Sequence, residues 1–496
     1  MYQNAAKTQD ETLDPQDWDA LRSLGHRMLD DMLDYLATVR ERPIWRPVPD
    51  EVRTALSGPV PRDPEGIDQA YADFKEFVLP YPFGNIHPRH WGWVNGTGSP
   101  SGALMEMLAA TMNPNVAGFD QSARLVEEQV LDWMRSLMGF PEGAGGLLVS
   151  GASMANLIGL AVARNTRAGF DVRQEGVAAA PGMLTVYCST ETHTSVHKAV
   201  ELLGLGRAAL REIPVDGQYR IDLDVLRETI TADRQQGRRP IAVVGTAGTV
   251  NTGAIDPLEP LAELCKAEDL WFHIDGAFGA LLTLSADLGP LVAGLERADS
   301  LAFDLHKWIY LPYEAGCILI RDARHQQDSF TVPAAYLTPL TGGVAAAPWL
   351  ADYGLQLSRQ FRALKVWMSL KEHGVDKYAR LIEQNVAQAQ YLADKIEATP
   401  MLELLAPAPL NIVCFRYNPG HLEADALNLL NRDILVQVQE RGIAVPSSTE
   451  LQGRFALRVA HTNHRSRRED FDLLVDAVLK IGAELANREN NSKEPT

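Results

Sequence analysis

Apolar residues follow a helical period in the first part of this chain. Seven of them form one stripe: Leu21, Leu24, Met28, Leu29, Met32, Leu33 and Leu36. Asp14 and Pro15 precede the stripe as an expected cap and first helical residue, and Asp17 adds an acidic first turn. A Pro-rich stretch and a second short helix, at about 68–78, follow. The pattern predicts an N-terminal helical segment over 1–85 whose apolar stripe needs a surface to pack against, on its own chain or on a partner.

From about residue 86 the period changes. Short β-rich runs alternate with helical patterns, and the runs read LLVS, LTVYCS, IAVVGTAG, LWFHID, SLAFD and AGCILIRD. Such alternation is typical of an α/β domain with a mostly parallel sheet, which we expect over 86–375. A long polar-faced helix then precedes NIVCFRYN and FALRVAHT, which predicts a small α+β domain over 376–496. Ligands of parallel sheets bind beyond the carboxyl ends of the strands.

Net charge and the placement of cysteines indicate which partners and which cellular compartment to expect. The 46 basic and 64 acidic residues leave a net charge of −18, which repels nucleic acids and anionic lipids. The most apolar stretch, GLLVSGASMANLIGLAVA, is interrupted by small polar residues, unlike a membrane span. The four cysteines lie far apart without a CxxC pair, and no secretory pattern opens the chain. We therefore expect a cytoplasmic protein without a nucleic-acid or membrane partner.

An acidic and a basic residue end two of the predicted strands. Asp275 closes LWFHID and is followed by the small residues GAFGA, which leave room for a planar group. Lys307 follows SLAFD, with His306 and Trp308 on either side. A lysine in this position is either an ordinary surface residue or a partly desolvated amine able to form a covalent bond with a carbonyl compound.

Two further features lie at the same predicted edge of the sheet. In LLVSGASMANL a strand turns into a helix, so that amides near Ala152 and the Ser153 hydroxyl face any anion bound there, although a plain capped helix explains the pattern too. His193 begins the helix that follows LTVYCS. An anion cradle, a stacking ring, a carboxylate and a lysine are the groups that pyridoxal 5'-phosphate requires.

In these motifs the chain resembles the group II pyridoxal-phosphate-dependent amino-acid decarboxylases, and it is closest to the aromatic-L-amino-acid branch. The segments that carry the resemblance are SGASMANL, THTSVHKA, GTAGTVNTGAID, HIDGAFGA, DLHKW and QLSRQFRALKVW. The resemblance spans nearly the whole chain. It implies the aminotransferase-like fold (fold type I of these enzymes), a homodimer whose active site is completed by the neighbouring chain, and decarboxylation of an L-amino acid.

The same resemblance assigns roles to single residues. Lys307 holds the cofactor covalently, Asp275 partners its ring nitrogen and His193 stacks on the ring. The remaining cofactor contacts fall on Ala152, Ser153, Thr246, Ala277 and His306. A Gly/Pro/Ala-rich loop carries Tyr336, the residue that returns a proton to the substrate. Because both His193 and Tyr336 are present, simple decarboxylation is favoured over the oxidative, aldehyde-forming reaction of some relatives.

The family pattern is not matched everywhere. Animal members have Asn at the position of Asp304 and Ser at that of Gly151, and an acidic side chain beside a phosphate is unfavourable, so Asp304 is not expected to bind it directly. Trp91 and Trp93 are expected to form an apolar substrate wall, although they would equally serve to fill a domain interface. The preferred substrate is therefore tyrosine, tryptophan, phenylalanine or a hydroxylated relative, with glutamate, aspartate or a sulfinate analogue as the alternative.

Four other functions compete with this interpretation. His193, His197 and Glu201 have the i, i+4, i+8 spacing of a helical metal site, but HExxH is absent and we expect no metal. Gly204, Gly206 and Ala209 match GxGxxA, yet they follow a helix, where a helix-ending glycine is the simpler explanation. A binding protein without catalysis, or another reaction on the same cofactor, completes the alternatives.

Overall fold

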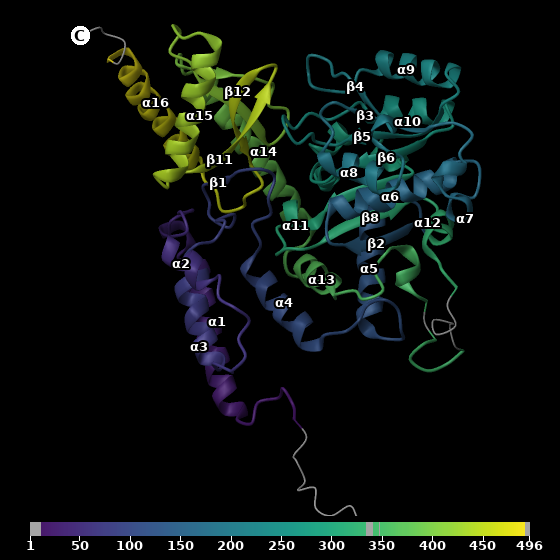
Figure 1. The fold of residues 1–496 in the computed structure, drawn as a ribbon, viewed down its shortest axis with the longest axis horizontal. Coiled ribbons are helices and arrows are strands. Elements are labelled where there is room, and N and C mark those ends of the chain that lie inside the picture. The colour runs from purple at the N-terminus through teal and green to yellow at the C-terminus, as the bar shows by residue number, and fades with distance from the viewer. Residues whose placement is uncertain (1–10, 334–340, 347, 492–496) are drawn as a thin grey trace, which may run out of the picture. The chain divides into compact units, whose positions relative to one another are not determined.

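The structure is a computed structural model that describes residues 11–333, 341–346 and 348–491, with side chains through residue 487. The chain forms two compact units, Met1–Phe83 and Gly84–Thr496 (Figure 1). In the part of the chain that is described, no helix is both long and apolar enough to cross a membrane.

The first unit is helical, as its apolar period predicts. It contains α1 (Trp18–Ala37), α2 (Asp50–Ala55), α3 (Ile67–Asp73) and a π-helical turn (Phe74–Val78). The expected cap was placed three residues too early: Asp17, not Asp14, caps α1, because its carboxylate accepts the free amides of Asp19 and Ala20. Tyr71 donates a hydrogen bond to Asp31 and so ties α3 to α1.

The second unit is built on a seven-stranded sheet in the order β2-β8-β7-β6-β5-β3-β4. Its strands are β2 (Gly145–Val149), β3 (Leu184–Ser189), β4 (Leu210–Ile213), β5 (Arg239–Thr246), β6 (Trp271–Asp275), β7 (Ser300–Asp304) and β8 (Gly316–Ile320). Neighbours from β7 to β4 pair in parallel, and β8 pairs antiparallel with both β2 and β7. The prediction of an α/β fold with a mostly parallel sheet is confirmed.

Helices cover this sheet, since its strands are apolar on both faces. The helices of this part of the chain are α4 (Pro100–Met112), α5 (Ser122–Leu137), α6 (Ala152–Arg167), α7 (Val172–Glu175), α8 (Thr194–Leu202), α9 (Leu223–Gln235), α10 (Leu258–Ala267), α11 (Leu305–Trp308), α12 (Ala323–Phe330) and α13 (Arg362–His373), of which α4 packs on α13. Helix α6 crosses β5, β6, β7 and β8, and α10 packs on β5 and β6.

A smaller sheet in the order β1-β11-β12-β10-β9 forms the C-terminal part. Its elements are β1 (His90–Trp91), β9 (Leu402–Leu404), β10 (Ile412–Tyr417), β11 (Val445–Leu451) and β12 (Arg454–Ala460), with helices α14 (Val375–Glu397), α15 (Ala424–Glu440) and α16 (Arg468–Asn491). Figure 1 shows α14 running between the two sheets, with α15 and α16 beside the smaller one. Strand β1 comes from the segment predicted as large domain, and the division at residue 376 stays a prediction.

Candidate active site

A pocket of about 310 Å³ opens where three parallel strands end. Strands β5, β6 and β7 end at Thr246, Asp275 and Asp304, and all three residues line the pocket. Helix α6 begins at Ala152 on the same pocket, and His193 caps α8 there. The parallel pairing of these strands brings their carboxyl ends to one edge, so residues far apart in sequence meet.

Lys307 lies in this pocket, directly after β7. Its Nζ atom is 3.1 Å from Oδ2 of Asp304. The other oxygen of Asp304 accepts the amide of Ala152, at 2.7 Å, which is the first amide of α6. Asp304 is therefore buried between the lysine and the helix N-terminus, two positive groups that stabilise its charge.

Asp275 is held from two sides. Asn156 donates a hydrogen bond to its Oδ2 at 2.8 Å, and the amide of Ala277 donates to its Oδ1 at 3.1 Å. Its carboxylate is buried at the pocket floor. A carboxylate fixed in this way suits a protonated ring nitrogen.

His193 stands at the rim of the same pocket. Its Nδ1 accepts the amide of Ser195 at 3.2 Å and lies 2.8 Å from the Ser195 hydroxyl. Desolvation lowers the pKa of the imidazole, which outweighs the opposite effect of the nearby Asp275 charge. The neutral ring is thus favoured, and a neutral ring stacks without adding charge to the site.

Polar groups for an anion and for a ring substituent face the pocket. The exposed Ser153 lies in the first turn of α6 and lines the pocket. The Thr246 hydroxyl is buried and has no hydrogen-bond partner among the described residues. A buried hydroxyl without a partner on the pocket lining indicates that a polar ligand completes the site. Ala277 and His306 also line it, and burial lowers the pKa of His306.

The two tryptophans expected to form the substrate wall are separated. Trp93 lines the pocket and is 52% exposed. Trp91 is fully buried in the core of the smaller sheet, where its ring stacks on Phe471 and its indole N–H donates to Ser466. The structure does not bring Trp91 to the pocket: β1 ends at Trp91, and Trp93 has a left-handed backbone with φ of 55°, so the two side chains do not share one face of an extended strand. Tyr336 lies outside the described residues.

Three residues that the sequence did not single out support the site. Asn156 is fully buried and contacts Asp275, as described above, and Ser195 contacts His193. Arg458 on β12 is buried behind the pocket wall, where it donates to the carbonyls of Val250 and Asn251. Arg458 has no carboxylate partner among the described residues, and burial lowers its pKa to about 10. The motifs SGASMANL and THTSVHKA contain Asn156 and Ser195, but the sequence gives these residues no role, since their partners come from other elements.

The competing metal and nucleotide sites are not supported. His197 pairs with Glu212 and Glu201 pairs with Arg207, and no cluster of metal-binding side chains occurs among the residues that the structure describes. Gly204 and Gly206 have φ of 75° and 83° just after α8, which is the turn expected at a helix end.

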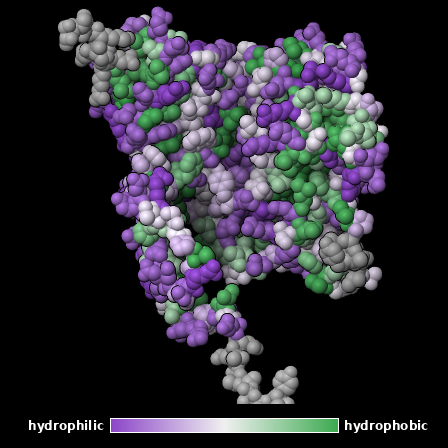
Figure 2. Space-filling model, viewed as in Figure 1, coloured by the Kyte–Doolittle hydropathy of each residue, from purple (hydrophilic) through white to green (hydrophobic). Residues whose placement is uncertain are grey.

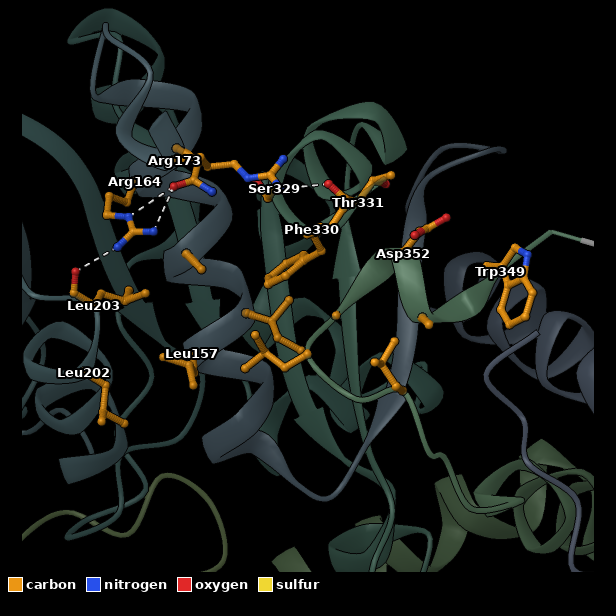
Figure 3. A pocket seen from close by; sticks show the side chains of 18 of the residues that line it. Leu157, Arg164, Arg173, Leu202, Leu203, Ser329, Phe330, Thr331, Trp349 and Asp352 are labelled. Atoms are coloured by element: carbon orange, nitrogen blue, oxygen red, sulfur yellow. Dashed lines mark hydrogen bonds between the residues drawn. The ribbon is translucent and has the colours of Figure 1, made fainter. Parts of the chain in front are cut away.

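A larger cavity, of about 1300 Å³, lies away from Lys307 between α6 and α12 (Figure 3). Apolar side chains such as Leu157 and Phe330 line it, and Figure 2 shows hydrophobic residues gathered where Figure 1 places these helices. Arg164 at its edge already donates to the Leu203 carbonyl, and Arg173 to that of Thr331. It shares no lining residue with the Lys307 pocket, and no lysine, cysteine or histidine occurs among its described lining residues.

Known proteins resemble this chain along most of its length. The family described as pyridoxal-dependent decarboxylase conserved domain matches residues 49–418. The aromatic-L-amino-acid decarboxylase of Bacillus atrophaeus is 33% identical over 471 residues, which span 93% of this chain and 95% of that protein. The L-2,4-diaminobutyrate decarboxylase of Rhizobium meliloti (strain 1021) is 32% identical over 431 residues, or 86% of this chain and 84% of that protein.

Solved structures agree with this relationship. The crystal structure of Oryza sativa TDC with PLP and tryptamine superposes with a TM-score of 0.88 at 25% identity, and the match covers 96% of this chain and 100% of that one. The predicted fold type is therefore confirmed.

Proposed function

The chain belongs to the pyridoxal-dependent decarboxylase family and is a pyridoxal 5'-phosphate-dependent amino-acid decarboxylase; from this we propose that it converts an aromatic L-amino acid to its amine and CO2. The observation that carries the site assignment is the meeting of Lys307, Asp275 and His193 in one pocket at the carboxyl edge of the sheet. Each comes from a different strand or helix, and each has the chemistry of one contact that the cofactor requires.

The pocket residues fit the cofactor. We propose that Ser153 and the N-terminus of α6 bind its phosphate, which would compete with Asp304 for the amide of Ala152, since a helix N-terminus stabilises an anion. Thr246 offers its unpartnered hydroxyl to a polar group on the ring. Ala277, being small, leaves space beside the ring, and His306 completes the wall next to Lys307.

When bound, the cofactor supplies a ring that takes up the electron pair released as CO2 leaves. Asp275 would keep the ring nitrogen protonated, because its buried carboxylate stabilises an adjacent positive charge. Lys307 would hold the cofactor through its amine, and Asp304, whose Oδ2 lies 3.1 Å from that amine, stabilises its charged form when it is not bound. His193 would cover the ring and exclude water from one face.

The lining of the pocket favours an aromatic over an acidic side chain in the substrate. Trp93, Val94, Val250 and Phe278 give it an apolar wall. Lys307 is the one Lys or Arg side chain among the described lining residues, and the cofactor takes its amine. A second carboxylate on the substrate would thus be desolvated without a cation, which is unfavourable. The relatives include an aromatic-L-amino-acid decarboxylase, in agreement with this choice.

Purified protein incubated with a panel of L-amino acids tests the substrate. We expect amine and CO2 from tyrosine, tryptophan, phenylalanine or a hydroxylated relative, and little from glutamate, aspartate, cysteine sulfinate or 2,4-diaminobutyrate. Lys307→Ala is the control and should lose both the visible absorbance of the bound cofactor and the activity. Preferential turnover of an acidic substrate would overturn the aromatic assignment.

Tyr336 is proposed as the residue that returns the proton to the substrate after CO2 leaves. Its support is the resemblance of its loop to that of family members. Tyr336→Phe should slow amine formation and raise the yield of aldehyde and ammonia, measured together by chromatography. An unchanged product ratio would exclude Tyr336 from this role, and aldehyde as the main product of the wild type would favour the oxidative alternative.

We also propose that two copies form a homodimer in the cytoplasm. Helix α4 presents Leu104, Met107, Leu108 and Met112, each more than a third exposed and uncovered by described residues of Gly84–Thr496. Such an apolar helix face is typical of a subunit interface. The four cysteines are unpaired and buried, which suits a reducing compartment.

A further inference from the structure

A fully buried amide connects two groups that the proposed function places against the cofactor: Asp275, at the ring nitrogen, and His193, over one face of the ring. Asn156 lies on α6 and contacts Asp275 of β6 at 2.8 Å and Ser195 of α8 at 2.9 Å, both through Nδ2. Its Oδ1 is 2.9 Å from Nε2 of His273. Both N–H groups and the oxygen of this side chain therefore have hydrogen-bond partners, and each partner comes from another element.

The direction of each hydrogen bond follows from the groups that can only donate or can only accept. A carboxylate accepts, so the Asn156 atom facing Asp275 is the amide nitrogen and the oxygen faces His273. His273 must then carry a proton on Nε2. Burial lowers the pKa of His273 to about 3, so its Nδ1 carries none.

The hydrogen bonds on the other side of His273 agree with these directions. Nδ1 of His273 lies 2.7 Å from the Ser300 hydroxyl, which must donate to it. The Ser300 oxygen in turn accepts the indole N–H of Trp271 at 2.7 Å. An indole nitrogen only donates, so the directions assigned from Asp275 and those assigned from Trp271 coincide.

Ser195 determines which nitrogen of His193 carries the proton. The backbone amide of Ser195 donates to Nδ1 of His193, so this nitrogen carries no proton. Because Asn156 donates to the Ser195 oxygen, the hydroxyl proton is free to point at the same Nδ1, 2.8 Å away. The neutral imidazole must then hold its proton on Nε2, the nitrogen remote from this network.

We propose that Asn156 is a positioning residue that orients the Asp275 carboxylate and, through Ser195, holds His193 as the Nε2-protonated tautomer. One side chain thus couples the partner of the ring nitrogen to the ring that covers the cofactor. The inference rests on the proposed roles of Asp275 and His193. Its consequence for the reaction is that His193 presents a hydrogen-bond donor, not a base, to whatever lies beside Nε2.

Two variants and a matched control separate this role from general stability. Asn156→Leu keeps the approximate shape but removes all three contacts, and Asn156→Asp keeps the shape but cannot donate to Asp275. Asn431→Leu is the control, because Asn431 is equally buried and makes three hydrogen bonds, to Tyr417 and Leu427, in the core of the smaller sheet. Cofactor affinity is measured by titrating each apo-protein with pyridoxal phosphate.

We expect both Asn156 variants to bind the cofactor about tenfold or more weakly than the wild type, since a hydrogen bond to a charged group is lost. The control should bind as the wild type does, whatever its thermal stability. Equal affinities for the Asn156 variants and the control would overturn the proposal. Should Asn156→Leu fail to fold, the Asp variant decides the matter, because it preserves the volume of the side chain.

The tautomer is measured without variants of Asn156. Nitrogen-15 NMR of histidine-labelled wild-type protein, with His193 assigned from its replacement by Asn, distinguishes the two neutral imidazole forms. We expect the proton on Nε2, in the apo-protein as well as with cofactor. A proton on Nδ1 would overturn the proposal. Failure of the proposed function would look different, since the wild type itself would then bind no cofactor.

Discussion

At the scale of the residue, Asp304 is the side chain whose charge is least expected. Its carboxylate accepts the first amide of α6 and pairs with Lys307, and so it uses the helix N-terminus that an anionic ligand would use. Asn in its place can still accept this amide but carries no charge. We therefore expect Asp304→Asn to bind pyridoxal phosphate about tenfold more tightly, because one like-charge interaction near the phosphate is removed.

Titration of the apo-protein with pyridoxal phosphate and with pyridoxal, which lacks the phosphate, measures this effect. The gain should be confined to the phosphorylated compound. If affinity for both compounds rises equally, the Asp304 charge acts on Lys307 and not on the phosphate.

A second buried carboxylate, Asp256, gives a dependence of stability on pH. Its oxygens accept the amides of Ile221 and Thr246, and burial raises its pKa from 3.8 to about 6. The folded protein thus binds a proton more tightly than the unfolded chain does. This contribution to stability is fully present below pH 3.8 and is lost as the pH rises through about 6. The free energy of unfolding falls by about 3 kcal/mol over this range.

Asp256→Asn, which cannot ionise, should lack this decline. Unfolding free energies of the wild type and the variant, measured in denaturant over this pH range, should show the wild type losing stability relative to the variant as the pH rises from 3.8 to above 6. Parallel curves would show that Asp256 has an ordinary pKa in the folded protein.

At the scale of the element, an ion pair whose two side chains are both fully buried joins α5 to the edge of the large sheet. Glu127 of α5 contacts Arg359, which precedes α13, and Arg359 also donates to the carbonyls of Val116 and Leu148. Removal of one partner leaves a buried charge without a counter-charge. Arg359→Met should therefore lower the free energy of unfolding by about 3–5 kcal/mol.

The double variant Glu127→Gln/Arg359→Met should recover part of this loss, because no unpaired charge remains. Thermal or denaturant unfolding of the two variants measures the difference. A double variant less stable than Arg359→Met would show that hydrogen bonds of the glutamate, such as that from the Leu148 amide, outweigh its charge.

At the scale of the whole molecule, the exposed face of α4 tests the proposed homodimer. Met107 is 54% exposed there, and in a twofold interface a glutamate at this position would bring two charges into an apolar contact. Met107→Glu should weaken dimerisation by about a hundredfold or more, since both charges lose their water. Decarboxylase activity should fall with it if the site needs the second copy.

Analytical ultracentrifugation over a range of concentrations measures the dissociation constant. Leu473→Glu on α16 is the matched control, because Leu473 is 48% exposed on the C-terminal part. A dimer that survives Met107→Glu would place the interface elsewhere.

The sequence by itself determined the succession of strands and helices and the candidates Lys307, Asp275, His193 and Ser153, to which the family resemblance added Thr246. It could do so because apolar periods define elements, and because residues at the carboxyl ends of parallel strands share one edge of the sheet. It also excluded a helical membrane span. These are properties of short segments, which neighbouring residues settle.

Only the tertiary structure decided which side chains meet. Trp91 and Trp93 are two positions apart, yet one fills the core of the smaller sheet and the other lines the pocket. In the sequence, Asn156 is a polar residue within an apolar helix and has no evident role. Its role follows from its contacts with Asp275 of β6 and Ser195 of α8, which only the fold brings to it. Contacts between distant segments depend on strand order and helix packing, which no local pattern encodes.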